Sequence, residues 1–281
     1  MDKELEKRLK TFALKIRMGA IEGVYNAKAG HPGGSLSIAE VLAWLYEKEM
    51  HIDPQQPQMP NRDRLVLSKG HGAPALYAAL ALKGFFPEEE IKSLRKLGAL
   101  LQGHPDMKHI PGVDMSTGSL GQGISTACGM ALAAKLNGDD WRVYTILGDG
   151  ELEEGQVWEA AMFAGFRKLD NLTAFVDLNN LQIDGTLDEV VSPMPVDEKF
   201  KAFGWNVICI DGHDFQQIEQ AYTQAKACKG RPTCIVANTV KGRGVSFMES
   251  AVGWHGVAPN TEQYTQAMNE LQAALNRLEN E

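Results

Sequence analysis

The sequence predicts an α/β protein, a parallel sheet flanked by helices. The first observation is that short apolar segments alternate with helical ones through the middle of the chain. This alternation is typical of a parallel sheet that is covered on both faces. The second observation is that several apolar segments run into Gly, Asp, Asn or His residues. Parallel sheets bind ligands at such strand ends, and we expect residues 1–281 to form a single domain of this kind.

The elements follow from the apolar runs and their period. Leu5, Leu9, Phe12 and Ile16 share one face of a helix that should continue to about Ala27. The further expected strands are 64–67, 142–147, 172–178, 205–210 and 233–238, and the further expected helices are 73–82, 155–166 and 215–228.

Glycines mark the connections between these elements. A Gly-rich break at 30–35 precedes a second helix that opens at Ser37. The segment 101–123 is rich in Gly, His, Pro and Ser, and a loop of this length is usually functional. Asn260 and Gln263 form a variant of the capping box, which predicts a terminal amphipathic helix over about 260–279.

Composition narrows the class of protein. The net charge is −8 and no basic stripe is present, so we expect no nucleic-acid partner. No apolar run approaches the ~18 residues that a membrane helix needs. The N-terminal sequence MDKELEKRLK lacks an apolar signal core, so we expect a cytoplasmic protein with no membrane contact. None of the four cysteines lies in a C-x-x-C pair, and we expect reduced, buried, structural thiols.

The strongest chemical feature is Gly148-Asp149-Gly150, which follows one expected strand, together with Asn179-Asn180, which follows the next. A βαβ unit brings two such ends side by side, so Asp149 and Asn179 should converge. A carboxylate and an amide oxygen, completed by carbonyl and phosphate oxygens, suit magnesium or calcium. The structural alternative is a strand-to-helix turn that uses Gly for its geometry and Asn as a cap.

Histidines form a second group. Four of the seven lie in Gly-rich or loop segments: His31, His71, His104 and His255. Such side chains could donate hydrogen bonds to sugar hydroxyls and move protons near neutral pH, although each alone could merely stabilise a turn. The other three have weaker claims, and the histidine at position 213 is typical of the entry to a helix.

A set of ordered motifs resembles the N-terminal domain of the transketolase family. They are GHPGGSLS, LSKGHGAPALY, GHPD, STGSLGQG, GDGELEEGQVWEA, NNLQIDG and VKGRGVSFME…WHGVAP. The resemblance covers nearly the whole chain. It implies the thiamine-diphosphate-binding fold, in particular its pyrophosphate-binding domain. It also implies transfer of a two-carbon ketol unit from a ketose or its phosphate to an aldose or its phosphate.

The same resemblance implies roles for individual residues. Asp149, Asn179 and the backbone oxygen of Leu181 would hold Mg²⁺, or Ca²⁺ or Mn²⁺, and Gly150 would contact the diphosphate. Further cofactor contacts would come from Gly118, Ser119, Leu120, His71, Glu154 and His255.

Catalytic roles would fall to His31, His71, His104 and His255 along the substrate channel. Glu154 would belong to a proton relay between two cofactor sites, with Glu159 close by at a dimer interface. For Glu151 and Glu153 we prefer a structural role in the solvated first turns of a helix.

The family's catalytic glutamate lies on a pyrimidine-binding domain that has no counterpart in these motifs. The simplest expectation is a second, C-terminal transketolase subunit, which would form an α2β2 heterotetramer with this chain. Two alternatives stay within thiamine enzymes: an alpha-type subunit of a 2-oxo acid dehydrogenase and a deoxyxylulose-phosphate synthase-like protein. A third alternative is a non-catalytic cofactor-binding protein.

Overall fold

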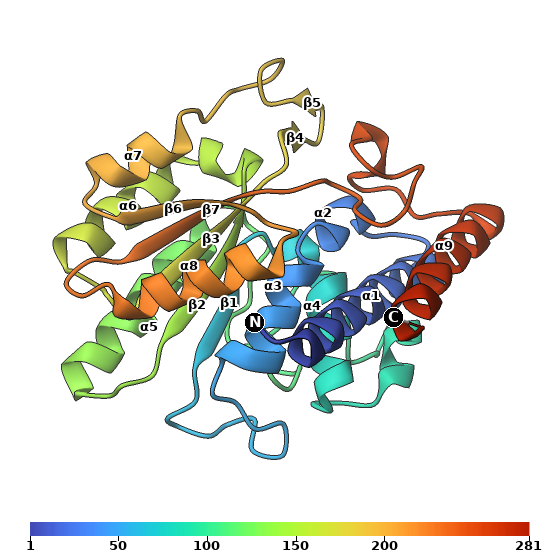
Figure 1. Cartoon of the computed structure of the whole chain (residues 1–281), viewed down its shortest axis with the longest axis horizontal. Coiled ribbons are helices and arrows are strands. Elements are labelled where there is room, and N and C mark those ends of the chain that lie inside the picture. The colour runs from blue at the N-terminus through green and yellow to red at the C-terminus, as the bar shows by residue number, and fades with distance from the viewer. Residues whose placement is uncertain (281) are drawn as a thin grey trace.

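The computed structural model describes residues 1–280, and its centre is a parallel sheet (Figure 1). The strands pair in the order β1-β2-β3-β7-β6, and every neighbouring pair is parallel. The predicted fold class is therefore confirmed. The strands are β1 (Arg64–Leu67), β2 (Val143–Gly148), β3 (Leu172–Leu178), β6 (Asn206–Asp211) and β7 (Thr233–Asn238).

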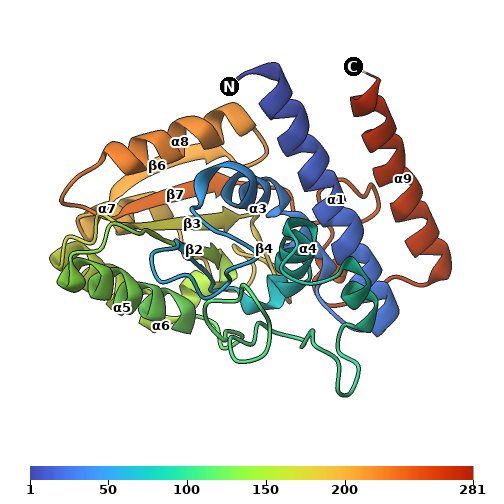
Figure 2. The same cartoon turned by 90° about the horizontal axis from the view of Figure 1, so that it is seen from below.

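Helices cover both faces of the sheet, as Figure 2 shows. One face packs against α5 (Gln122–Asn137), α6 (Gly155–Phe166) and α7 (Val196–Ala202). The other face packs against α1 (Lys3–Ala27), α3 (Ala39–Trp44), α4 (Ala73–Lys83) and α8 (Phe215–Ala227). Every residue of the central strands β2 and β3 is buried, because both of their faces are covered.

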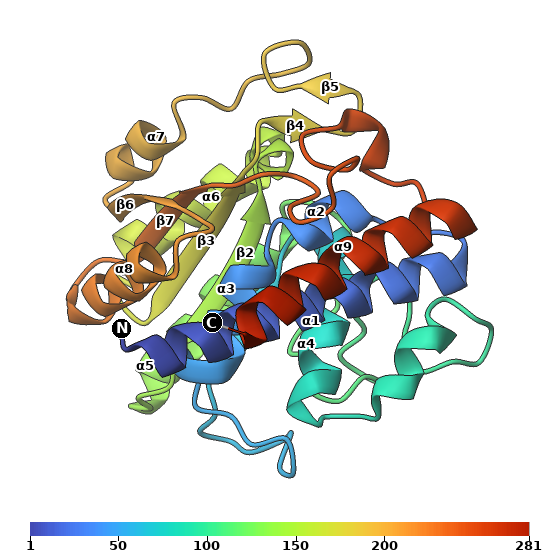
Figure 3. The ribbon, with the colours of Figure 1, turned by 45° about the vertical axis from the view of Figure 1, so that its right-hand side comes forward.

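The last helix lies beside the first, on the outside of this second layer (Figure 3). α9 (Thr261–Glu279) packs Leu271 and Ala267 against Ile21 of α1. The predicted capping box is present, since Asn260 Oδ1 accepts from Gln263 N at 2.9 Å and Gln263 Oε1 accepts from Asn260 N at 2.9 Å.

Several elements differ from the prediction. The Gly-rich break holds a short helix, α2 (Pro32–Leu36), with Pro at its first turn, where no backbone N–H is needed. The next helix begins at Ala39 and ends in a π-helical turn, Leu45–Glu49. Three-residue to six-residue 3₁₀ turns cover Gly70–Gly72, Glu88–Ser93, Gly150–Glu153 and Val252–Trp254.

Helices α5 and α7 and the hairpin of β4 (Leu181–Gln182) and β5 (Gly185–Thr186) were not predicted. α5 is rich in Ala and carries a weak apolar stripe, so its period is hard to see. No helix within residues 1–280 is long and apolar enough to cross a bilayer.

The four cysteines are free, as expected, but they are not all buried. Cys128 and Cys234 lie in the core, which confirms the prediction for these two. It is wrong for Cys209, which is exposed, and for Cys228, which is half-buried. The reason for Cys209 is that β6 lies at the edge of the sheet, where most positions are only partly covered.

Gly165 gives a test of how tightly α6 packs. A Cβ at this position would lie 1.8 Å from the carbonyl oxygen of Phe203, so the backbone would have to move. We expect Gly165→Ala to lower the free energy of unfolding by about 1–3 kcal/mol. Gly129→Ala on α5 is the matched control, because no atom lies within 4 Å of the added methyl group. It should stabilise the chain by up to about 1 kcal/mol in the same urea titration. Equal effects of the two variants would contradict this packing.

Candidate active site

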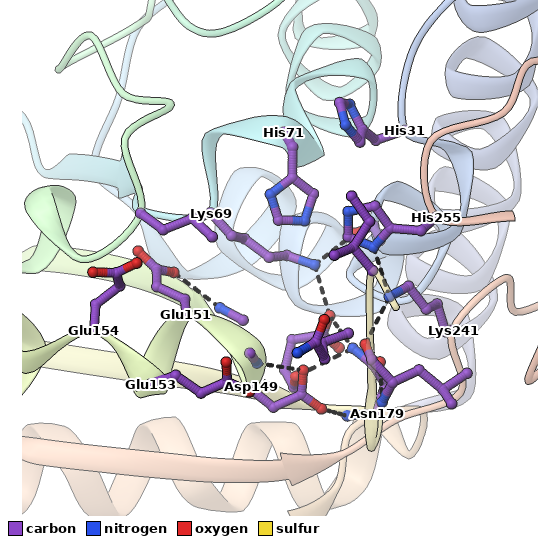
Figure 4. A pocket seen from close by; sticks show the side chains of 18 of the residues that line it. His31, Lys69, His71, Asp149, Glu151, Glu153, Glu154, Asn179, Lys241 and His255 are labelled. Carbon is purple, nitrogen blue, oxygen red and sulfur yellow. Dashed lines mark hydrogen bonds and ion pairs between the residues drawn. The ribbon is translucent and has the colours of Figure 1, made fainter. Parts of the chain in front are cut away.

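Four strands end at one edge of the sheet, and each is soon followed by a charged or polar residue. Lys69 follows β1, Asp149 follows β2, Asn179 follows β3 and Lys241 follows β7. These side chains line one cleft of about 450 Å³. Figure 4 shows them below a group of histidines, with Glu151, Glu153 and Glu154 to one side.

Asp149 lies at the bottom of the cleft and is 2% exposed. Its carboxylate accepts from the backbone N–H groups of Gly150 at 2.8 Å, Asn179 at 2.8 Å and Asn180 at 2.6 Å. The predicted convergence of Asp149 and Asn179 is therefore confirmed. Burial, followed by the nearby charge of Asp177, raises the pKa of Asp149. A carboxylate has about four lone-pair positions, so capacity for a cation remains after three backbone bonds.

A buried ion pair lies beneath the cleft and was missed in the sequence. Lys69 Nζ donates to Asp177 Oδ2 at 2.6 Å and to the carbonyl oxygen of Gly34 at 2.6 Å. The two side chains are 1% and 0% exposed. Burial raises the pKa of Asp177, but the charge and hydrogen bond of Lys69 outweigh this and hold it below its usual value. The available signal was a carboxylate inside an apolar strand, which a buried sheet tolerates only with a partner.

Asp177 also orients the side chain of Asn179. The amide Nδ2 of Asn179 donates to Asp177 Oδ2 at 3.1 Å and to the Asp177 carbonyl at 3.3 Å. With both contacts on the nitrogen, the amide oxygen Oδ1 is left as the acceptor, here for Leu181 N at 3.2 Å. The orientation of Asn179 thus presents an oxygen and not a nitrogen for a metal.

Lys241 is the second buried cation of the cleft. Its Nζ lies 2.7 Å from the carbonyl oxygen of Leu181 and 2.9 Å from His255 Nδ1. Burial lowers the pKa of Lys241, while the charge of Asp149 opposes this shift. Sequence reasoning missed Lys241, whose only signal was its place in the motif VKGRG.

The four histidines singled out in the sequence come together above these residues. The ring of His31 lies 5.3 Å from that of His71, 6.3 Å from that of His104 and 5.5 Å from that of His255, measured between centroids. His71 and His255 are 5.2 Å apart. The Nδ1 atom of His31 is buried without a hydrogen-bond partner within residues 1–280. A polar ligand atom could complete that site.

The electrostatics of these rings differ from the expectation. Burial is the main cause that lowers the pKa of each, to about 4 for His31, to about 3 for His255, well below the usual value for His71, and below it for His104. These imidazoles are therefore neutral at pH 7. They can exchange hydrogen bonds with hydroxyl groups, but they do not titrate near neutral pH as the sequence suggested.

The solvated helix turn expected for Glu151 is wrong, because this side chain is buried. Glu151 is 2% exposed, and its carboxylate accepts from Ser68 Oγ at 2.5 Å, Gly121 N at 2.9 Å and Gly148 N at 3.0 Å. Burial raises its pKa, and these hydrogen bonds oppose the shift. Glu151 thereby joins the loop before α5 to the end of β2. Glu153, in contrast, is exposed as predicted.

Other predicted residues surround the cleft. Gly118, Leu120, Gly150 and Glu154 belong to its lining, whereas Ser119 is exposed and does not. Gly118 has φ +145°, and a Cβ there would lie 3.0 Å from the ring of His104, so only glycine fits. Glu159 is exposed on α6. The roles implied for these residues stay predictions.

The three remaining histidines lie outside the cleft. His51 is exposed, and His109 pairs with Asp106 at 2.6 Å on the surface. His213 lies just before α8, whose cap is Asp214, which confirms it as a helix entry. It also contacts Glu40 in the interior, which the sequence did not suggest.

The residues present fit a phosphorylated cofactor held through a divalent cation. Within residues 1–280 no group of three His, Cys, Asp or Glu side chains could hold a metal alone. The candidate ligands are the Asp149 carboxylate, the Asn179 amide oxygen and the Leu181 carbonyl oxygen, which also accepts from Lys241 Nζ. This set suits a hard cation that takes its other ligands from phosphate and water, which is how Mg²⁺ is usually bound. Fold and cleft together are those of a protein that binds a diphosphate cofactor at strand ends.

Comparison with known proteins identifies the family. Residues 9–274 match the model of the transketolase thiamine diphosphate binding domain. The chain belongs to the transketolase family and forms its thiamine diphosphate-binding domain.

Relatives fall into two sizes. The chain is 52% identical over 257 residues to the 6-deoxy-6-sulfo-D-fructose transketolase subunit SqwG of a Clostridium species, which covers 92% of this chain and 94% of the relative. It is 42% identical to an apulose-4-phosphate transketolase subunit of Phocaeicola vulgatus, over 95% of both chains. The crystal structure of Campylobacter jejuni transketolase superposes with a TM-score of 0.89 at 33% identity. That match covers 99% of this chain but 46% of the other, so the chain spans about half of such a transketolase.

The buried ion pair can be tested by its contribution to stability. Lys69→Met keeps an apolar chain of similar length but leaves Asp177 buried without its main counter-charge. We expect a loss of about 3–5 kcal/mol in the free energy of unfolding, measured by denaturant titration. Lys201→Met removes the exposed pair with Asp197 at 2.8 Å and should change little. A Lys69→Met variant as stable as the wild type would show that Asp177 is stabilised by other groups.

Proposed function

We propose that this chain is the N-terminal subunit of a two-chain transketolase, which moves a two-carbon ketol unit from a ketose or its phosphate to an aldose or its phosphate. One observation supports the proposal: Asp149, Leu181 and the oriented amide of Asn179 line one cleft together with four clustered histidines. The oxygen atoms of Asp149, Asn179 and Leu181 suit the diphosphate end of a cofactor. The histidines suit a sugar substrate with many hydroxyl groups.

The proposed partner is a C-terminal subunit with the pyrimidine-binding domain, in an α2β2 heterotetramer. Support comes from the two relatives that this chain matches over at least 94% of their length, because both are named as transketolase subunits. A 2-oxo acid dehydrogenase or deoxyxylulose-phosphate synthase activity has no such support among these names. A non-catalytic cofactor-binding protein is disfavoured because the donor set and the histidine cluster are both intact.

Each residue of the cleft has a proposed task. Asp149, Asn179 and the Leu181 carbonyl would hold Mg²⁺, or Ca²⁺ or Mn²⁺, and the metal would help to hold the diphosphate. Thiamine diphosphate, when bound, would supply the nucleophilic carbon for ketol transfer. The neutral imidazoles orient the sugar hydroxyl groups and exchange protons with them once the substrate changes their surroundings.

The remaining lining has supporting tasks. The loop of Gly118, Ser119 and Leu120 contacts the aminopyrimidine or its linker. Glu154, on the exposed rim, reaches the proton relay that joins two cofactor sites.

The metal assignment makes a direct prediction. Asp149→Ala removes a ligand of the proposed cation, so thiamine diphosphate should bind at least tenfold more weakly, and added Mg²⁺ should no longer strengthen binding. Titration calorimetry with and without Mg²⁺ measures both effects. Asp184→Ala is the control, because this exposed residue lines the outer part of the same cleft. Unchanged Mg²⁺-dependent binding in Asp149→Ala would refute the assignment.

The two-chain proposal predicts that activity needs a partner. We expect the isolated chain to transfer no ketol unit and to gain activity with a subunit that bears the pyrimidine-binding domain. The assay would use fructose 6-phosphate, xylulose 5-phosphate, 6-deoxy-6-sulfo-D-fructose and apulose 4-phosphate as donors, and pyruvate as the substrate of the competing activities. Robust ketol transfer by the isolated chain would overturn the need for a partner. Turnover of pyruvate alone would overturn the transketolase proposal.

A further inference from the structure

A buried ionic triad lies outside the cleft and has no part in the function proposed so far. Arg17 of α1 donates through its Nη2 atom to both carboxylate oxygens of Glu40 on α3, at 2.8 and 2.7 Å. His213, before α8, contacts the same carboxylate through Nδ1 at 3.0 Å. The side chains of Arg17, Glu40 and His213 are 5%, 9% and 10% exposed. None of the three lines the proposed active site.

Charge fixes the hydrogen-bonding pattern of this triad. Burial alone would raise the pKa of Glu40, but Arg17 and His213 outweigh it and lower the pKa to about 2. Glu40 is therefore ionised and can only accept, so the Nδ1 atom of His213 must carry a proton and donate. The other ring nitrogen of His213, Nε2, accepts from the backbone N–H of Val240 at 2.8 Å. The neutral tautomer satisfies both contacts at once.

Val240 directly precedes Lys241, the cation that contacts the Leu181 carbonyl and His255 in the cleft. On the other side of Lys241, Gly242 N donates to the carbonyl oxygen of Gly33 at 3.0 Å. Lys241 therefore lies between two backbone anchors. The first anchor is the ring of His213, a member of the triad, which accepts from Val240 N. The second is the carbonyl oxygen of Gly33 in α2, which accepts from Gly242 N.

The same triad reaches α2 a second time. Arg17 Nε donates to the carbonyl oxygen of Leu36 at 3.2 Å, at the end of this helix. α2 follows His31 and includes Gly34, whose carbonyl oxygen accepts from Lys69 Nζ. The triad thus contacts both the segment that brings Lys241 to the cleft and the short helix that follows His31.

We propose that His213, held in one tautomer by Glu40 and Arg17, is a positioning residue for Lys241. Its Nε2 atom fixes the Val240 amide and so sets the position of the Lys241 ammonium group, which would interact with the diphosphate of the cofactor. The inference rests on the proposed function for the identity of that ligand. The positioning itself concerns only residues of this chain.

Two substitutions distinguish the contact of His213 Nδ1 with Glu40 from the contact of Nε2 with Val240. In His213→Asn the amide nitrogen takes the place of Nδ1, so the contact with Glu40 is kept and that with Val240 is lost. In His213→Gln the longer side chain places its amide oxygen near the position of Nε2, so the contact with Val240 is kept and that with Glu40 is lost. A role in stability alone would make the variants similar, whereas positioning through Nε2 makes only His213→Asn defective.

Hydrogen exchange in the ligand-free chain is the first measurement. We expect the Val240 amide to exchange faster in His213→Asn and at nearly the wild-type rate in His213→Gln. Amides of the central strands β2 and β3 serve as the internal control for global destabilisation and should not change. Equal exchange of the Val240 amide in the wild type and both variants would overturn the proposal.

Cofactor binding is the second measurement, by calorimetry with thiamine diphosphate and Mg²⁺. We expect His213→Asn to weaken binding roughly tenfold or more, as supporting-residue substitutions at ligand sites do, and His213→Gln to weaken it far less. In a Lys241→Ala background the effect of His213→Asn should disappear, because two residues that act through one contact are not additive. The same fold-change in both backgrounds would overturn the link to Lys241. A wild-type chain that binds no thiamine diphosphate would refute the proposed function, and hydrogen exchange would still decide the positioning.

Discussion

The buried carboxylate of Asp177 is the constraint on which the rest of the site depends. It is fully buried at the end of a central strand and cannot remain charged there without partners. Lys69, Ser37, Thr239 and Asn179 all donate to it. These residues follow or precede four different elements, so one charge joins the segments after β1, β3 and β7 and the turn before α3.

A consequence of this arrangement is that ligand orientation is settled before any ligand arrives. Asn179 must direct its amide nitrogen to Asp177, which leaves its oxygen for a cation. Asp149 is likewise fixed by three backbone N–H groups. Preorganised groups of this kind do not have to be reordered when a ligand binds, which favours affinity.

The two ends of the cleft differ in electrostatic character. At the strand ends lie two carboxylates, Asp149 and Asp177, and two buried lysines, Lys69 and Lys241. A charged ligand would change the net charge of this end of the cleft. The histidines above them are neutral, because burial and the nearby cations disfavour a second positive charge. A charged cofactor at one end and an uncharged polyol chain at the other match this division. The open rim with Glu154 is the side on which the proposed partner would complete the site.

The sequence by itself determined the fold class, most strands and the positions that carry chemistry. The strands 64–67, 172–178 and 233–238 were predicted to the residue, because continuous apolar runs end sharply at polar residues. Asp149 and Asn179 were found because each follows an expected strand, and the four histidines because each lies in a Gly-rich or loop segment.

The tertiary structure alone decided which charges are buried and what they contact. Glu151 lies in an acidic run that is typical of a solvated turn, yet it is buried because two loops and β2 close over it. Lys69, Asp177 and Lys241, like the triad of Arg17, Glu40 and His213, pair across long stretches of chain. Local periodicity contains no information on such partners, because burial of a charge depends on residues that only the folded chain brings together.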